Sequence, residues 1–230
     1  MSNNALVCWS GGCDSTVVLA NLLEQRTIKV RTISIIHNQV GANAEQKSAR
    51  QTIKNELTKK YGEFESFEVN ITSDGNAVRS LQGGLCQPII WLPLSTLYLQ
   101  ENEDLYVGYI SGDDVWHYKQ DLLKLFNYSQ IIQSKIGILQ MPLEWQTKSD
   151  IIYKLKQHNL YEYVWYCEYP TYDKKQCGIC HSCEVHNMYL TQYDKIWNNI
   201  SASLEKEAVP LKIKKQKKVK IKKKVKVLNG

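Results

Sequence analysis

No stretch of this 230-residue chain contains the roughly 18 consecutive apolar residues that a membrane-spanning helix needs. The first residues also lack a cationic segment followed by an apolar run and a cleavage site, so we expect a cytoplasmic protein. In that compartment the 7 cysteines would stay reduced, which favours metal-binding or catalytic roles over a disulfide framework. With 43% hydrophobic and 23% charged residues, the composition is that of a folded protein.

Acidic residues are absent from the last part of the chain, Leu211–Gly230, which contains 10 lysines. The other 19 basic residues are outnumbered by 23 acidic ones, so the net charge of +6 comes from this tail and does not by itself indicate nucleic-acid binding. The tail has no aromatic residue for base stacking and no arginine for base reading. We interpret it as a solubilising tail, with contact to a polyanion and an interfacial membrane helix as the alternatives.

Strand and helix patterns alternate along the first third of the chain. They predict strands at 5–9, 29–36 and 64–71, separated by helices at 14–23 and 42–60. This alternation is typical of an α/β fold with a parallel sheet and right-handed crossovers. The later sequence predicts further helices at 88–99, 121–134, 151–158 and 184–199, and strands at 104–110 and 136–141.

The run Ser10-Gly11-Gly12-Cys13-Asp14-Ser15 lies where the first strand should end and the first helix should begin. Adjacent glycines allow positive φ angles and a close approach of the backbone to a ligand. The free amides of the turn and the helix dipole then favour an anion, typically phosphate. No Gly-Lys-Ser/Thr follows, so this is not a Walker A loop. The run resembles the PP-loop of the ATP pyrophosphatases, which cleave ATP at its α-phosphate.

This interpretation assigns nucleotide binding to eight consecutive residues: Trp9, Ser10, Gly11, Gly12, Cys13, Asp14, Ser15 and Thr16. The Ser10 and Ser15 hydroxyls are donors, and Asp14 either caps the helix or holds Mg²⁺ against phosphate oxygens. The alternative is a capped turn that binds no ligand.

Three cysteines near the C-terminus, Cys177, Cys180 and Cys183, are each separated by two residues, and Cys167 precedes them. Four thiolates in this arrangement can close a tetrahedral Zn²⁺ site. Such a site leaves no open position for water, so we expect the zinc to be structural.

Two alternatives remain for this metal site. His181 or His186 could replace Cys167 as the fourth ligand, and an iron–sulfur cluster could replace zinc. The ferredoxin pattern, however, places a cysteine and a proline where this chain has Asn187 and Met188. We interpret the remaining cysteines as packing residues rather than nucleophiles: Cys8, Cys13 and Cys86.

Together the two motifs resemble the 7-cyano-7-deazaguanine synthase family over approximately residues 5–190. Gly108–Asp114 and the segment from Pro142-Leu143 to Thr147-Lys148 also match patterns of that family. The resemblance implies a HUP-like (adenine nucleotide alpha hydrolase-like) α/β domain over residues 1–160. A small zinc-binding lobe would follow over 161–200, and the basic tail over 201–230.

The resemblance also implies a reaction. MgATP would adenylate the carboxylate of 7-carboxy-7-deazaguanine, ammonia would displace AMP, and a second ATP would dehydrate the amide to the nitrile, in a queuosine or 7-deazaguanine pathway modifying tRNA or DNA. The loop would hold the phosphates, and Asp14, Lys148 and Asp114 are the candidate catalytic residues. For Lys148 the alternative is a solvated lysine, and for Asp114 a helix cap. A homodimer is left open.

One segment departs from the family. Gln87-Pro88-Ile89-Ile90-Trp91 stands where the family has Val-Pro-x-Arg-Asn, so an apolar pair replaces two polar residues near the expected substrate pocket. A related ligase that stops at the amide, or transfers the adenylated deazaguanine to another acceptor such as a protein, is therefore the first alternative function. A non-catalytic, zinc-stabilised nucleic-acid-binding protein is the second. Release of AMP separates the enzymes from the binding protein.

Overall fold

The computed structural model describes residues 3–37, 42–72 and 86–207. It contains two compact units, Met1–Asp194 and Lys195–Gly230. The described part of the second unit is the end of one helix, and the lysine tail lies outside the described residues. The divisions expected after residues 160 and 200 remain predictions.

The first unit is built on a parallel sheet of five strands, in the order β3-β2-β1-β4-β5. This order puts β1 in the centre, with β2 on one side and β4 on the other. In open parallel sheets, ligands bind at the carboxyl ends of the strands beside the switch point, the place where the strand order reverses. In this sheet the switch point lies between β1 and β4. The strands are β1 (Asn4–Cys8), β2 (Lys29–His37), β3 (Glu65–Ile71), β4 (Glu103–Tyr106) and β5 (Leu139–Gln140).

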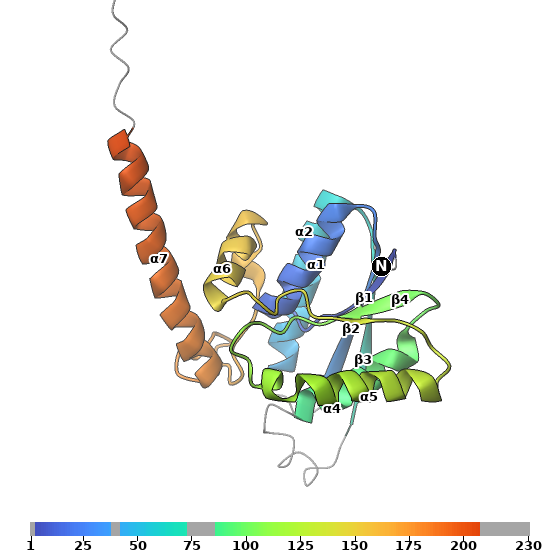
Figure 1. The fold of residues 1–230 in the computed structure, drawn as a ribbon. Coiled ribbons are helices and arrows are strands. Elements are labelled where there is room, and N and C mark those ends of the chain that lie inside the picture. Colours follow the sequence, from blue (N-terminus) through green and yellow to red (C-terminus); the bar gives the residue numbers. More distant parts are fainter. Residues whose placement is uncertain (1–2, 38–41, 73–85, 208–230) are drawn as a thin grey trace, which may run out of the picture. The chain divides into compact units, whose positions relative to one another are not determined.

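Helices cover both faces of the sheet (Figure 1), which confirms the expected α/β class. One face packs against α1, α2 and α6, and the other against α4 and α5. The central strand serves both layers, because Ala5 and Val7 point into the first core and Leu6 points into the second. The helices are α1 (Cys13–Gln25), α2 (Asn43–Tyr61), α4 (Cys86–Tyr98), α5 (Lys119–Ile132), α6 (Lys148–Gln157) and α7 (His181–Glu207), with the short 3₁₀ helices η1 (Asp114–Tyr118) and η2 (Tyr161–Tyr163). Among the described helices, none has the length and apolar character needed to cross a membrane.

The predicted strand at 104–110 is shorter in the structure, because β4 ends at Tyr106. Gly108 then approaches the first turn of α1 so closely that an added Cβ would lie 2.7 Å from the Ser15 amide nitrogen. The predicted strand at 136–141 is likewise reduced to β5. Gly108 thus allows the chain that follows β4 to lie against the first turn of α1, beside the paired ends of β1 and β4.

We predict that Gly108→Ala lowers the free energy of unfolding by about 1–3 kcal/mol, because backbone atoms of α1 must move to admit the methyl group. Gly62→Ala is the control: Gly62 has a φ of +98° but open space around its Cβ position, so it reports conformational strain alone. Urea unfolding measures both. A free energy of unfolding of Gly108→Ala equal to that of the wild type would contradict the close-contact argument.

Candidate functional site

The loop between β1 and α1 adopts a shape that needs glycine. Gly11 has a φ of +86°, in the left-handed region, and an added Cβ would lie 2.9 Å from the Arg50 Cγ and 3.0 Å from the Gln46 carbonyl oxygen. Gly12 is the N-cap residue of α1 and makes no side-chain cap, so the first amides of the helix have no capping side chain. The turn therefore presents backbone donors at the positive end of a helix.

Hydroxyl groups hold the loop in this shape. The Ser10 and Ser15 Oγ atoms are 3.1 Å apart, and the Gly12 amide donates to the Ser10 Oγ at 3.1 Å. Beneath the loop, the Trp9 indole N–H donates to the Thr16 Oγ1 at 3.0 Å, and both side chains are buried. Trp9 and Thr16, expected to bind nucleotide, are thus placed where they support the loop from the core.

Arg50, in α2, supports the loop from outside, and the sequence analysis missed it. Its guanidinium donates to the Ser10 carbonyl oxygen at 3.0 Å and to the Glu68 carboxylate at 2.7 Å. The arginine is 6% exposed, so its charge needs this partner. Its helical spacing from the apolar Ile53 indicates that Arg50 lies on the buried face of the helix, but not which residue it contacts.

Asp14 and Lys148, both predicted to be catalytic, meet in the structure. The Lys148 Nζ lies 2.8 and 2.7 Å from the two carboxylate oxygens of Asp14. Burial, the largest single effect, would lower the pKa of Lys148, but the Asp14 charge, the hydrogen bonds to Asp14 and further negative groups nearby together outweigh it. The pKa is therefore raised and the ammonium stays charged. Lys148 begins α6 directly after the capping box of Thr147 and Asp150, and its side chain is not a solvated surface group.

The acidic residue beside this pair is Asp113, one position before the residue that we predicted. Asp114 is exposed at the start of η1, whereas Asp113 is partly buried and accepts a hydrogen bond from the Ile110 amide at 2.8 Å. Burial raises the pKa of Asp113 to about 6, although the Ile110 amide lowers it, and the charges of Asp14 and Lys148 also act on it. The two aspartates are adjacent in the sequence after Gly112, so the sequence alone does not indicate which of them lies at the site.

A hollow of about 100 Å³, here called the loop hollow, opens between these groups and the strand ends. One side is formed by the loop and Asp14. The other is mainly apolar and aromatic, and includes Trp91 from the segment that departs from the family pattern. The lining residues are Cys8, Trp9, Ser10, Gly12, Asp14, Ser15, Ile35, Trp91, Val107, Gly108 and Tyr109.

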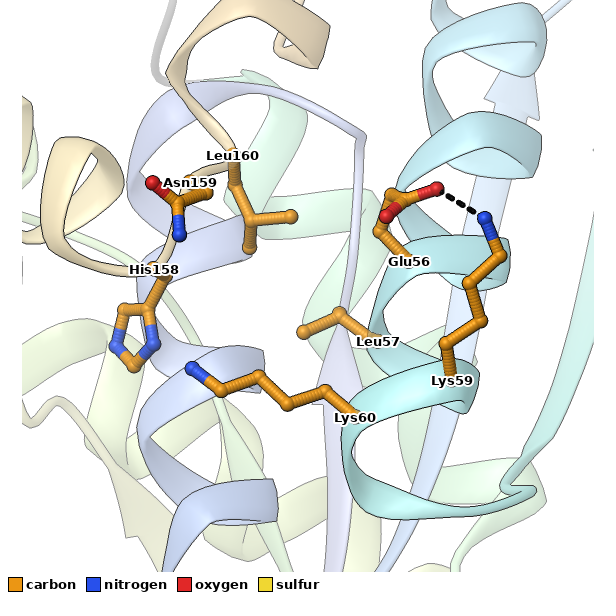
Figure 2. A pocket seen from close by; sticks show the side chains of 7 residues that line it. All are labelled: Glu56, Leu57, Lys59, Lys60, His158, Asn159 and Leu160. Carbon is orange, nitrogen blue, oxygen red and sulfur yellow. Dashed lines mark hydrogen bonds and ion pairs between the residues drawn. The ribbon is translucent and has the colours of Figure 1, made fainter.

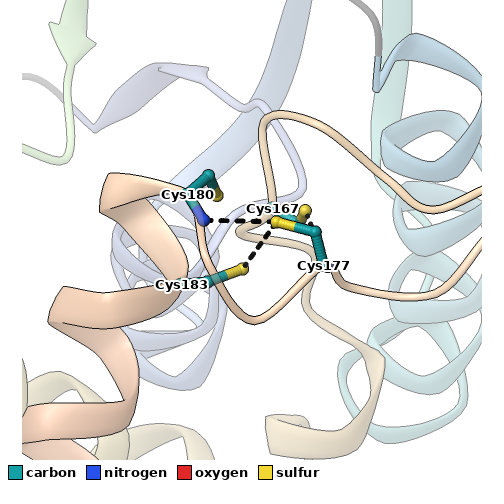
Figure 3. A group of neighbouring side chains, drawn as sticks. All are labelled: Cys167, Cys177, Cys180 and Cys183. Carbon is teal, nitrogen blue, oxygen red and sulfur yellow. Dashed lines mark hydrogen bonds between the residues drawn. The ribbon is translucent and has the colours of Figure 1, made fainter.

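The four predicted metal ligands form one cluster (Figure 3), with the Sγ atoms of Cys167, Cys177, Cys180 and Cys183 all within 4.8 Å of one another. The Cys177 and Cys183 sulfurs are 4.0 Å apart. Backbone amides donate to the sulfurs of Cys167 and Cys177, each at 3.3 Å. Hydrogen bonds from backbone amides, above all that of Ile179, lower the pKa of Cys177 to about 7, which favours the thiolate that a metal needs. The cluster can therefore bind a metal ion.

His186, considered above as a substitute for Cys167, has a different place. Its Nδ1 lies 3.8 Å from the Cys13 Sγ and its Nε2 lies 3.0 Å from the Tyr161 hydroxyl, while its ring stacks on Tyr166 at 3.6 Å. Cys13 is buried, and burial raises its pKa to about 12, which disfavours the thiolate that a nucleophile needs. His181, the other substitute, begins α7 and is exposed.

A second, larger hollow of about 290 Å³ lies where α2 and α6 end (Figure 2). It is lined by Glu56, Leu57, Lys59, Lys60, His158, Asn159 and Leu160. Because none of the residues discussed above lines it, the two hollows are separate features.

Removal of any one of the four clustered thiols should reduce metal binding, since thiolates are the ligands that hold a soft divalent ion. We predict that Cys180→Ser lowers the metal content of the purified protein well below one ion per chain, measured by elemental analysis. Cys8→Ser, outside the cluster, is the control and should leave the content unchanged. Equal metal content in the two variants would contradict the assignment.

Burial lowers the pKa of His186 to about 4, from an ordinary value of 6.5. Between these values the unfolded chain binds a proton that the folded chain does not, so stability is lost as the pH falls through this window. We predict that wild-type protein loses about 3 kcal/mol relative to His186→Phe between pH 6.5 and 4. Urea unfolding of both proteins at each pH measures the difference, from which acid effects common to both cancel. A constant difference would refute the prediction.

Comparison with known proteins shows which family part of the chain is similar to. The sequence model described as Queuosine biosynthesis protein QueC matches residues 104–194, less than half of the chain. The matched part contains Gly108, Asp113, Lys148 and the four clustered cysteines, while the loop lies before it. No curated protein matches the chain.

Two solved structures resemble the fold at low similarity. One is the U34-tRNA thiolase NcsA from Methanococcus maripaludis with its 4Fe-4S cluster, at 18% identity and a TM-score of 0.46, over 93% of this chain and 76% of that one. The other is a predicted subunit of tRNA methyltransferase from Methanocaldococcus jannaschii, at 14% identity and a TM-score of 0.40, over 76% of this chain and 96% of that one. The family match over residues 104–194, the loop and the cysteine cluster together support a QueC-like PP-loop ATP pyrophosphatase, a group of enzymes that use ATP.

Proposed function

We propose that this protein joins a carboxylate to ammonia at the expense of ATP, with 7-carboxy-7-deazaguanine as the acid and 7-cyano-7-deazaguanine as the product. The observation that carries the proposal is the loop hollow, where the turn before α1 and the charged pair of Asp14 and Lys148 stand beside an aromatic wall. One site thus combines hydrogen-bond donors for phosphate oxygens with an aromatic surface on which a planar ring can stack.

In the first step a carboxylate oxygen attacks the α-phosphorus of ATP, and the bond to the β-phosphate breaks. Pyrophosphate leaves with the electron pair, so negative charge grows on it. The amides of the loop and the Ser10 and Ser15 hydroxyls are donors that can stabilise this charge. Lys148 would bring a positive charge to the same phosphates, and the Asp14 carboxylate would supply an oxygen ligand for their Mg²⁺.

In the second step ammonia attacks the acyl carbon and AMP departs, which leaves the amide. A second ATP then activates the amide oxygen, and loss of that oxygen with AMP yields the nitrile. Asp113, with its pKa near 6, is placed to accept a proton beside the charged pair, a role that we expected of Asp114. The main contribution of the protein is to hold the reactants in line.

The aromatic wall supports a planar heteroaromatic substrate. Trp91 and Tyr109 can stack on such a ring, and Ile35 adds apolar contact. Among the described residues that line the hollow, only Asp14 is charged, so this part of the wall lacks the polar pair that the family pattern places there. This favours, as the second candidate, a related ligase that stops at the amide or transfers the acyl group to a different acceptor.

We propose that the metal of the cysteine cluster is a structural zinc ion. Sulfurs bound to one tetrahedral zinc, at about 2.3 Å each, stand about 3.8 Å apart. The separation of 4.0 Å between the Cys177 and Cys183 sulfurs fits this value. A four-iron cluster instead binds each cysteine to a different iron, which spreads the sulfurs farther apart. When bound, zinc would stabilise the folded lobe and take no part in the chemistry.

The test is incubation of the metal-loaded protein with MgATP, ammonium and 7-carboxy-7-deazaguanine, followed by mass spectrometry of the product and measurement of AMP and pyrophosphate. We predict formation of the nitrile, and a loss of about 10²–10³-fold in the rate for Asp14→Asn and for Lys148→Ala. Lys124→Ala, which alters an exposed lysine of α5, is the matched control and should keep full activity.

The outcomes separate the candidate functions. AMP together with an amide or an adduct would favour the second candidate ligase. A folded, metal-loaded protein that releases no AMP with any deazaguanine acid would overturn the ligase proposal and leave a binding protein.

A further inference from the structure

The segment that leads into the cysteine cluster touches the phosphate loop directly. The Trp165 amide donates to the Gly11 carbonyl oxygen at 3.1 Å. The indole N–H of the same residue donates to the Cys167 carbonyl oxygen at 2.8 Å. One residue therefore bonds both to the loop and to the first of the four cysteines.

The segment that leaves the cluster reaches the loop as well. His186 lies one helical turn after Cys183, is fully buried, and places its Nδ1 3.8 Å from the Cys13 Sγ. The Tyr161 hydroxyl on its other nitrogen and the Tyr166 ring on its face hold the imidazole in this orientation. The loop is thus contacted on both sides of Gly12, by chain that flanks the cluster on both sides.

The cluster itself is the core of this part of the chain. The buried apolar residues there are Cys167, Cys180 and Cys183, with Trp165 and Tyr166 packed against them. Three buried thiols enclose too little apolar surface to hold the two flanking segments together. A bound metal joins residues 167 and 177–183 covalently and removes the freedom that they would otherwise have.

We infer that Trp165 and His186 hold the phosphate loop in its binding shape while a metal occupies the four cysteines, so that metal and ATP bind with positive cooperativity. This rests on the proposed function, because it takes ATP as the ligand of the loop. By linkage the effect is reciprocal: metal strengthens ATP binding by the same factor by which ATP strengthens metal retention. His186 and Trp165 act as positioning residues and do not touch the nucleotide.

The first measurement compares ATP binding by calorimetry in zinc-loaded protein, in folded protein freed of metal by a chelator under reducing conditions, and in two zinc-loaded variants of His186. We expect metal removal to weaken ATP binding by about 5–150-fold. His186→Phe fills the space without a ring nitrogen and should weaken binding although its zinc content is unchanged. His186→Asn keeps a polar nitrogen near the Cys13 sulfur and should restore most of the affinity. Met188→Phe, at an exposed position of the same helix, is the matched control.

The second measurement is the zinc affinity, determined by competition with a chromogenic chelator with and without saturating ATP. In wild-type protein ATP should raise zinc affinity by the factor found in the first measurement, and in His186→Phe this factor should fall toward one. A purely structural role of His186 would change stability without changing this ratio.

Each result decides the inference. Equal ATP affinity with and without zinc, or no effect of ATP on zinc retention, overturns the coupling and leaves the proposed ATP chemistry intact. If the protein freed of metal does not remain folded, the zinc-loaded variants decide: unchanged ATP affinity in His186→Phe overturns the inference. Absence of ATP binding in zinc-loaded wild-type protein overturns both this inference and the proposed function.

Discussion

The first turn of α1 carries backbone amides whose N–H groups have no hydrogen-bond acceptor within the helix. The surrounding residues hold this turn in one orientation. Free amides bind an anion only when they converge, and a turn that contains two glycines has little stiffness of its own. Arg50 holds the Ser10 carbonyl from α2, and Gly108 lets the end of β4 pack against the first helical residues. Trp165 holds the Gly11 carbonyl from a third direction. The shape of this turn is therefore a product of tertiary structure rather than of the loop sequence alone.

Buried charges fix the strands that carry this turn. Arg31, in β2, pairs with Glu65 at the start of β3 and with the fully buried Glu103 at the start of β4, at 3.0 and 2.9 Å. These ion pairs connect three strands, including the two that flank the central strand β1. Glu65 is exposed, whereas the Arg31–Glu103 pair is buried. Removing one partner of the buried pair would leave an uncompensated charge, so this pair favours one register over its alternatives. The carboxyl ends of β1 and β4 then lie together, where the loop hollow opens.

Local patterns were sufficient to predict the fold class, the loop and the cysteine cluster, because each depends on residues close together in the sequence. The apolar run of β1, the two glycines and the spacing of Cys177, Cys180 and Cys183 each carry their own physical reason. The contacts that complete the site join distant residues. Arg50 is separated from Ser10 by 40 positions and His186 from Cys13 by 173, and no periodicity reports such a contact. The choice between Asp113 and Asp114 depends on the direction of one turn, which the hydrogen bond from the Ile110 amide sets.

The cysteine lobe shows how a metal site and the loop before α1 can be coupled through direct contacts. A segment as short as residues 161–194 cannot build a core of its own, and its buried interior consists mainly of thiols. Ligation of those thiols is the interaction strong enough to order the segment. Because the ordered segment also bonds to Gly11 and lies against Cys13, the free energy of ligation acts on the loop as well. By the coupling inferred above, metal ligation in this lobe helps to determine how well the amides of α1 converge on a phosphate.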